Sequence, residues 1–359
     1  MGNEQGYGRT MQRGQRRDHP WAKGGMACLA LLGAIVLGGC GITPRSDVQG
    51  ESSPEPQVAS PEPNLTNPQP TSPSSPSLKV VTTIAPMTQF TQAVAGDRAA
   101  VVQLIPSNVG IHDFQAKPRD VETIANADVL IQNGVGLETF LADLIRNAGN
   151  PDLTIVEAGE GIPTVSSPDQ GEEPHAEGEQ DPHNHNHGGA NPHLWLDPLR
   201  AVSQVENIRQ ALVTADPQGK EIYEANAAAY IQALKDLDRE IGARLSPYAG
   251  QTFVTFHDFA VYFAQRYGLE VEFLVEVPEL SPSPQDLQRI INLIEAENIQ
   301  ALLTEPAAGK ENLSALAQDL KLEISVFDPL ESGDNTPETY FKIMRQNAEN
   351  IANAMSPDS

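Results

Sequence analysis

The chain is short of cysteine, of basic residues and of long apolar runs, and each shortage excludes a class of protein. Its two cysteines are Cys28 and Cys40, so neither a disulfide framework nor a cysteine-rich metallochaperone site organises the remaining residues. Lys and Arg number 23 against 48 Asp and Glu, a formal net charge of -25 that argues against nucleic-acid binding and slightly favours a cationic ligand. The sequence also contains no His-Glu-x-x-His motif, which argues against a zinc hydrolase.

The first 40 residues differ in kind from the rest and predict export. The apolar run from Met26 to Leu37 is about 12 residues long, too short to cross a membrane as a helix but typical of a signal peptide, and basic residues precede it. It ends in Leu-Gly-Gly-Cys at Cys40, which resembles a bacterial lipobox, although Gly38 stands where Ala or Ser is commoner. We therefore predict a lipoprotein signal peptide over 1–40, with lipidation of Cys40; secretion without lipidation is the alternative.

The rest of the chain divides by composition and periodicity. Residues 41–77 are dominated by Pro, Ser, Gln and Glu and cannot bury enough apolar surface to fold, which predicts a disordered tether. Beyond them, strand-like and helix-like segments alternate, as in α/β proteins with parallel sheets. We predict an N-terminal α/β lobe over 78–216 with an inserted His-rich loop at about 159–190, a long linking helix over 217–245, and a C-terminal α/β lobe over 246–359.

The expected elements follow from apolar patterning and from turn residues. Strands are expected near 79–84, 100–105, 128–132, 153–156, 251–256, 270–277, 299–303 and 323–327. Helices are expected near 86–95, 118–126, 137–147, 198–214, 217–245, 258–267, 284–297, 310–320 and 337–354.

Residues that bind metals stand near the ends of several predicted strands. His112 follows the second strand, His257 ends the fifth, Asp328 ends the last, and His193 lies at a junction between a loop and a helix. Ligand sites in parallel sheets lie beyond the carboxyl ends of the strands, so these side chains can meet in one cleft. Three imidazoles and a carboxylate suit Zn²⁺, whereas Mn²⁺ favours more oxygen ligands.

Three motifs surround these histidines: His112-Asp113-Phe114 with Pro118-Arg119-Asp120, then Asn191-Pro192-His193-Leu194-Trp195-Leu196-Asp197-Pro198, then Phe256-His257-Asp258. They resemble the motifs of a known family, the cluster A-I (cluster 9) solute-binding proteins of zinc and manganese ABC importers. The resemblance implies two lobes joined by a long helix, with the metal in the cleft between them. It also implies metal binding by His112, His193 and the third-motif residue, which is commonly Glu in manganese members and His in zinc members. His257 therefore indicates zinc.

The resemblance leaves the fourth ligand open. Asp328-Pro329-Leu330 looks like the C-terminal aspartate motif of the family, so Asp328 is a candidate, with water or another carboxylate as alternatives. The inserted loop adds His175, His183, His185 and His187 among acidic residues, a composition typical of weak, exchangeable metal binding. A tolerated low-complexity insertion is the other interpretation of this loop.

The function that the resemblance implies is capture of Zn²⁺ outside the cytoplasmic membrane and its delivery to a permease. The implied partners are an ABC permease membrane subunit with its cytoplasmic ATPase, and the membrane through the lipid anchor, at the periplasmic face or cell surface; we expect a monomer and no nucleic acid. A Mn²⁺ importer component and a lipid-anchored adhesin are alternatives. A secreted zinc hydrolase is disfavoured, because Glu276 and Glu305 follow strands but neither lies near a predicted ligand in the sequence.

Overall fold

The computed structural model describes most of the chain from Leu78 onward. The described residues are 78–107, 109–111, 114–165, 189–275, 281–306, 309–331 and 333–356. The predicted signal peptide with Cys40, the tether, Glu276, and the candidate ligands His112, His175, His183, His185 and His187 lie outside the described residues.

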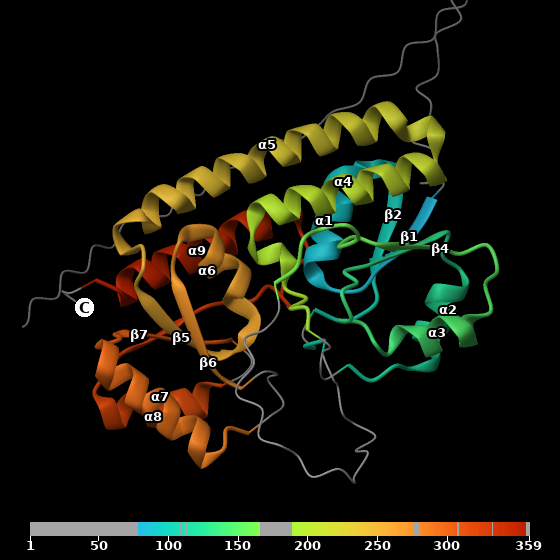
Figure 1. Ribbon diagram of the computed structural model, residues 1–359. Helices are drawn as coiled ribbons and strands as arrows, with labels where there is room; N and C mark the ends of the chain where they lie inside the picture. The colour runs from blue at the N-terminus through green and yellow to red at the C-terminus, as the bar shows by residue number, and fades with distance from the viewer. Residues whose placement is uncertain are drawn as a thin grey trace, which may run out of the picture. The chain divides into compact units, whose positions relative to one another are not determined.

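The first half of the described chain forms a parallel four-stranded sheet. Its strands are β1 (Leu78–Thr82), β2 (Ala99–Gln103), β3 (Val129–Gln132) and β4 (Thr154–Glu157), in the order β2-β1-β3-β4 (Figure 1). The helices α1 (Ala85–Ala95), α2 (Pro118–Ala125) and α3 (Leu141–Ala148) connect them. The central strands are rich in Val, Ile and Leu because parallel sheets are buried on both faces.

The second half repeats this topology. Its sheet contains β5 (Thr252–His257), β6 (Glu270–Val275), β7 (Ala301–Thr304) and β8 (Ile324–Val326), all parallel and in the order β6-β5-β7-β8. The helices of this half are α6 (Val261–Tyr267), α7 (Pro284–Glu297), α8 (Lys310–Leu320) and α9 (Pro337–Ala354). Pro at the first or second position begins α1, α2, α4, α7 and α9, where its missing N–H costs no hydrogen bond.

Two helices connect the halves: α4 (Pro198–Ala215) and α5 (Lys220–Leu245). The predicted long helix is α5, which begins three residues later than expected because Pro217–Gly219 forms a 3-10 turn. Its buried apolar side chains recur every three or four residues, as the sequence predicted: Tyr223, Ala227, Tyr230, Leu234, Leu237, Ile241 and Leu245. Figure 1 shows α5 running beside α4 and α9, which it contacts. The fold class predicted from the sequence is confirmed.

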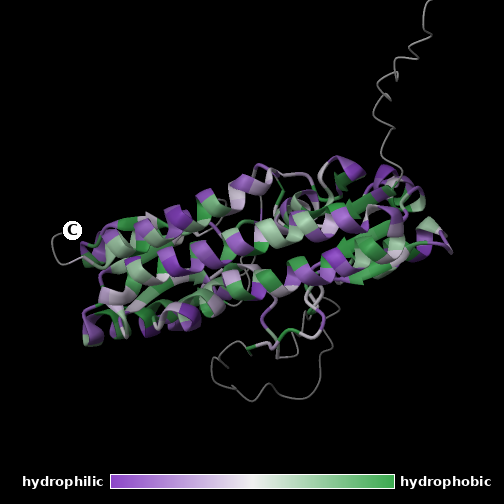
Figure 2. Cartoon of the chain, turned by 90° about the horizontal axis from the view of Figure 1, so that it is seen from above, coloured by the Kyte–Doolittle hydropathy of each residue, from purple (hydrophilic) through white to green (hydrophobic). Residues whose placement is uncertain are grey.

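One hydrophobic core continues through both halves. It includes Val80 and Val129 of the first sheet, Phe253 and Leu303 of the second, and the buried stripe of α5. Separate clusters fill the opposite faces of the sheets, under α2 and α3 in one half and under α7 and α8 in the other. Figure 2 shows helices in which hydrophilic and hydrophobic residues mix, as expected for helices that cover a core. Among the described helices, none is both long and apolar enough to cross a bilayer.

Candidate metal centre

His257 is placed by the second sheet. It is the last residue of β5, where the chain order of neighbouring strands reverses, a position at which α/β sheets commonly bind ligands. Its side chain is only 1% exposed. One ring nitrogen, Nδ1, lies 2.7 Å from Glu305 Oε1, and the other, Nε2, lies 3.9 Å from Glu331 Oε1. The ring is thus held on one side by a carboxylate and faces a second carboxylate on the other.

His193 approaches the same place from the first half of the chain. It precedes the 3-10 turn Leu194–Leu196, which leads into α4, and its side chain is buried. The oxygen of the Asn191 side chain accepts from the His193 backbone N–H at 3.1 Å and lies 3.0 Å from ring Nδ1. Ring Nε2 lies 3.1 Å from Glu331 Oε1, and the ring centroids of His193 and His257 are 5.3 Å apart.

Glu331 completes this group. Its carboxylate and the two imidazoles each offer one ligand atom, and the three atoms lie within 4.8 Å of one another. Two imidazole nitrogens and a carboxylate oxygen are the ligand types that Zn²⁺ prefers. Among the described residues, this is the group of His, Cys, Asp and Glu side chains that can hold a metal ion.

The segment that carries Glu331 is fixed against the segment that carries His193. Trp195 donates its indole N–H to the Pro329 carbonyl at 2.7 Å, and Tyr340 donates its hydroxyl to the Trp195 carbonyl at 2.7 Å. Both aromatic side chains are fully buried. These side-chain to backbone hydrogen bonds therefore hold the segment before Glu331 against the segment after His193.

Comparison with known proteins gives the family. The family described as the zinc-uptake complex component A, periplasmic (ZnuA), matches residues 80–354. The chain belongs to this family. The resemblance drawn from the sequence motifs is thus confirmed.

Two relatives define how far the similarity extends. The chain is 31% identical over 283 residues to the high-affinity zinc uptake system protein ZnuA of Bacillus subtilis, covering 77% of this chain and 88% of that protein. It is also 31% identical over 286 residues to the zinc-binding protein AdcA of Streptococcus pyogenes, covering 76% of this chain and 55% of AdcA. The chain therefore spans about half the length of AdcA.

Solved structures agree with the family. A crystal structure of ZnuA matches with a TM-score of 0.67 and 25% identity, covering 78% of this chain and 99% of the other. The laminin-binding protein Lmb of Streptococcus agalactiae, described as a bifunctional protein with adhesin and metal transporting activity, matches with a TM-score of 0.67 and 26% identity, covering 78% and 99%.

The sequence analysis did not single out Glu331, a member of this candidate group. It stands three residues after Asp328, the residue that the motif singled out. In the structure Asp328 Oδ1 accepts from the Leu330 N–H at 2.8 Å, a local turn of the Asx type, and Leu330 has a φ of 65°. The Asp328 carboxylate thus turns the chain, and it is not a member of the group formed by His193, His257 and Glu331. The sequence motif does not indicate this turn. The sequence analysis allowed for Glu331 only by leaving another carboxylate open as the fourth ligand.

His112 lies outside the described residues, but the chain on either side of it is described. Ile111 is buried, and the Ser107 carbonyl accepts from the Gly333 N–H at 2.6 Å. Gly333 is two residues beyond Glu331. The chain that leads to His112 therefore contacts the chain that leaves Glu331.

The electrostatics of the centre are dominated by carboxylates. Burial by itself lowers the pKa of His257, but the charges of Glu305 and Glu331 outweigh it and raise the pKa to about 9. Burial raises the pKa of Asp328, against the hydrogen bond from Leu330. A site whose buried acids stabilise a cation on His257 is also suited to a metal cation.

Tyr262 joins the two ends of the inserted loop next to this centre. Its hydroxyl donates to the Asn191 carbonyl at 2.6 Å and accepts from the Val165 N–H at 3.1 Å. The Asn191 N–H donates to the Val165 carbonyl at 2.9 Å. The Asn191 amide also donates to the Asp258 carbonyl at 2.9 Å, so this residue links the loop ends, His193 and the residue after His257.

Proposed function

We propose that this protein is the zinc-binding component of an ABC importer, which captures Zn²⁺ outside the cytoplasmic membrane and delivers it to a permease and its ATPase. The observation that carries the proposal is the meeting of His193, His257 and Glu331, whose ligand atoms lie within 4.8 Å of one another. Relatives named for zinc uptake and zinc binding support the choice of metal.

His112 would supply the remaining ligand. The contact between Ser107 and Gly333 supports this, because it holds the chain before His112 against the chain after Glu331. Three imidazoles and one carboxylate would then form a tetrahedral set, which favours Zn²⁺ over Mn²⁺. In this arrangement Glu331 takes the place that the sequence analysis gave to Asp328.

The remaining predictions complete the proposal. The lobes would be 78–216 and 246–359, joined by the helix of 217–245, and the protein would act as a monomer. The signal peptide would direct export, and lipidation at Cys40 with the tether of 41–77 would hold the protein at the periplasmic face or cell surface, as supported by the lipoprotein AdcA of Streptococcus pneumoniae, 30% identical over 275 residues. His175, His183, His185 and His187 would add weaker zinc sites.

A second role as an adhesin has one supporting observation, the similarity to Lmb with its described adhesin activity. Adhesion makes no demand on the buried imidazoles. A variant that loses zinc binding but keeps a surface-adhesion activity would separate the two roles.

The deciding experiment is isothermal titration of the metal-free protein with Zn²⁺ and with Mn²⁺, beside His257→Ala and a deletion of 166–188. We expect one tight Zn²⁺ site that survives the deletion and is lost in His257→Ala. Tighter binding of Mn²⁺, or the absence of a tight site, would contradict the proposal.

A further inference from the structure

Glu305 is a buried carboxylate aimed at the back of His257. It is the first residue after β7, the strand beside β5, and its side chain is only 4% exposed. Its Oε1 atom lies 2.7 Å from His257 Nδ1 and accepts from the His257 backbone N–H at 3.4 Å. The same oxygen therefore contacts both the backbone and the ring of His257.

This contact determines which ring nitrogen faces the metal centre. A carboxylate accepts hydrogen bonds, so the proton of the neutral imidazole resides on Nδ1, next to Glu305. Nε2 is then the nitrogen presented toward Glu331 and His193. The other tautomer would carry its proton on Nε2 and could not coordinate a metal through that atom.

We propose that Glu305 is a positioning residue for the metal site, which fixes the tautomer and orientation of His257 and supplies a second negative charge close to the bound divalent cation. This inference rests on the proposed zinc-binding function. A carboxylate behind a ligand imidazole makes the imidazole a better donor to the metal and holds its ring in place.

The two described imidazoles differ in this respect. His193 has a neutral amide oxygen, that of Asn191, near its Nδ1, whereas His257 has a carboxylate. Charge-assisted hydrogen bonds are shorter and stronger than neutral ones, in agreement with 2.7 Å against 3.0 Å. With neutral imidazoles, Glu331 and Glu305 together balance the two positive charges of Zn²⁺.

The test compares Glu305→Ala and Glu305→Gln in the full chain, with Glu272→Gln as the matched control. Glu272 lies on β6, also beside β5, but its carboxylate pairs with Arg289 at 2.9 Å. Zn²⁺ affinity is measured by competition with a chelator and the ligand field by Co²⁺ absorption. The tautomer of His257 is measured by ¹⁵N NMR of the metal-free protein, at a pH high enough for the imidazole to be neutral.

We expect Glu305→Ala to weaken Zn²⁺ binding about 10- to 100-fold, the usual effect of removing an outer partner of a ligand, and to populate both tautomers of His257. Glu305→Gln should keep the Nδ1–H tautomer, because its amide oxygen can accept, but should bind Zn²⁺ more weakly than the wild type. Glu272→Gln should match the wild type in all three measurements.

Two sets of outcomes keep this inference apart from the proposed function. If the wild type binds zinc, His257→Ala loses it and both Glu305 variants keep wild-type affinity, Co²⁺ spectrum and tautomer, Glu305 is not a positioning residue. If the wild type has no tight zinc site, the proposed function itself fails. Should Glu305→Ala unfold, as seen by circular dichroism, Glu305→Gln alone decides the inference.

Discussion

The two halves of the molecule share one sheet topology, and in each a buried glutamate lies beside the end of a central strand, but the two glutamates have different origins and different partners. Glu305 directly follows β7, whereas Glu138 lies in the turn between β3 and α3. In the first half, Glu138 accepts from the Thr83 hydroxyl at 2.8 Å, just after β1, and from the backbone N–H groups of Asn133 and Gly134 at 2.7 and 3.0 Å. In the second, Glu305 contacts His257 at the end of β5.

The difference shows why one buried glutamate stabilises the backbone and the other contacts a candidate metal ligand. In the first half, Thr83 follows the central strand, and Glu138 accepts hydrogen bonds from its hydroxyl and from the backbone of the turn after β3. These hydrogen bonds stabilise the backbone. Where the central strand ends in His257, the glutamate holds an imidazole whose second nitrogen faces the other half of the chain. A buried acid is present in both halves, and its partner at the strand end, a hydroxyl in one half and an imidazole in the other, distinguishes the two.

The largest effect should come from removing the structural glutamate. Glu138→Ala leaves three buried donors without their acceptor, at about 1–3 kcal/mol for each unsatisfied group, so we expect a loss of at least about 3 kcal/mol in the free energy of unfolding. Urea denaturation of the metal-free protein measures it. Glu138→Gln, which keeps one acceptor oxygen, should lose less; equal stability of Glu138→Ala and the wild type would remove the distinction between the halves.

Next is the loss of a ligand from the second half. Glu331→Ala should weaken Zn²⁺ binding by more than about 100-fold, above the range typical of outer partners, because it removes a coordinating oxygen. Asp328→Asn is the control, since its side-chain oxygen can still accept from the Leu330 N–H. A chelator-competition titration separates them, and a larger loss in Asp328→Asn would restore Asp328 as the ligand.

The third effect is a pH dependence with a different window in each half. Burial raises the pKa of Glu138 from 4.5 to about 7, so its contribution to stability is fully present below pH 4.5 and is lost as the pH rises through 7. The contribution of His257, whose pKa is raised from 6.5 to about 9, is present below pH 6.5 and is lost as the pH rises through 9. Each group changes the free energy of unfolding by about 3 kcal/mol at most across its pH window.

Variants separate these windows. Urea denaturation of the metal-free protein at several pH values should show a flatter profile below pH 7 for Glu138→Gln and a flatter profile above pH 7 for His257→Gln. A wild-type profile in either variant would mean that its residue does not titrate in that window.

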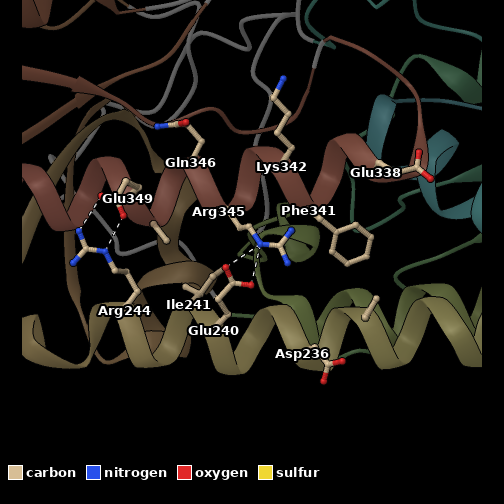
Figure 3. Close-up of a pocket in the computed structure, with 12 residues that line it drawn as sticks. Asp236, Glu240, Ile241, Arg244, Glu338, Phe341, Lys342, Arg345, Gln346 and Glu349 are labelled. Carbon is tan, nitrogen blue, oxygen red and sulfur yellow. Dashed lines mark hydrogen bonds and ion pairs between the residues drawn. The ribbon is translucent and has the colours of Figure 1, made fainter.

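The smallest effect on stability is expected from the exposed ion pairs between α5 and α9. A groove of about 860 Å³ lies there, and two ion pairs cross it: Arg244 with Glu349 at 2.8 Å and Arg345 with Glu240 at 2.9 Å (Figure 3). All four side chains are exposed, so Arg345→Ala should change the free energy of unfolding by less than about 1 kcal/mol. Thermal unfolding at low and high salt checks this, and a larger effect would indicate a role beyond the ion pair.

The sequence predicted the fold well because its signals are local. Apolar alternation, the proline residues at helix starts and the helical spacing along α5 each act within one element. The predicted start of the third helix was less accurate: it was expected at 137, but α3 begins at Leu141. The reason is that Glu138 accepts a hydrogen bond from the turn after β3, so its segment forms a turn instead of a helix. A buried contact between distant segments decided that boundary.

The site was predictable in part. His193 and His257 meet, as the motifs suggested, although only His257 lies at a strand end, whereas His193 lies at the turn before α4. Glu331 was missed because the turn made by Asp328 is set by its side-chain hydrogen bond, which motif similarity does not reveal. Glu305 was set aside for its distance in sequence from any ligand, whereas the pairing of β5 with β7 brings it to His257.

The junction at Tyr262 gives this chain a point at which sequence can be added or removed. Val165 and Asn191 are fastened to each other and to one hydroxyl, so the peptide between them begins and ends at the same spot. For a loop whose ends are held together, each doubling of its length costs about 0.6 kcal/mol in loop-closure entropy. The number of residues between these two anchor points can therefore change at a small cost in stability, without moving Asn191 or His193.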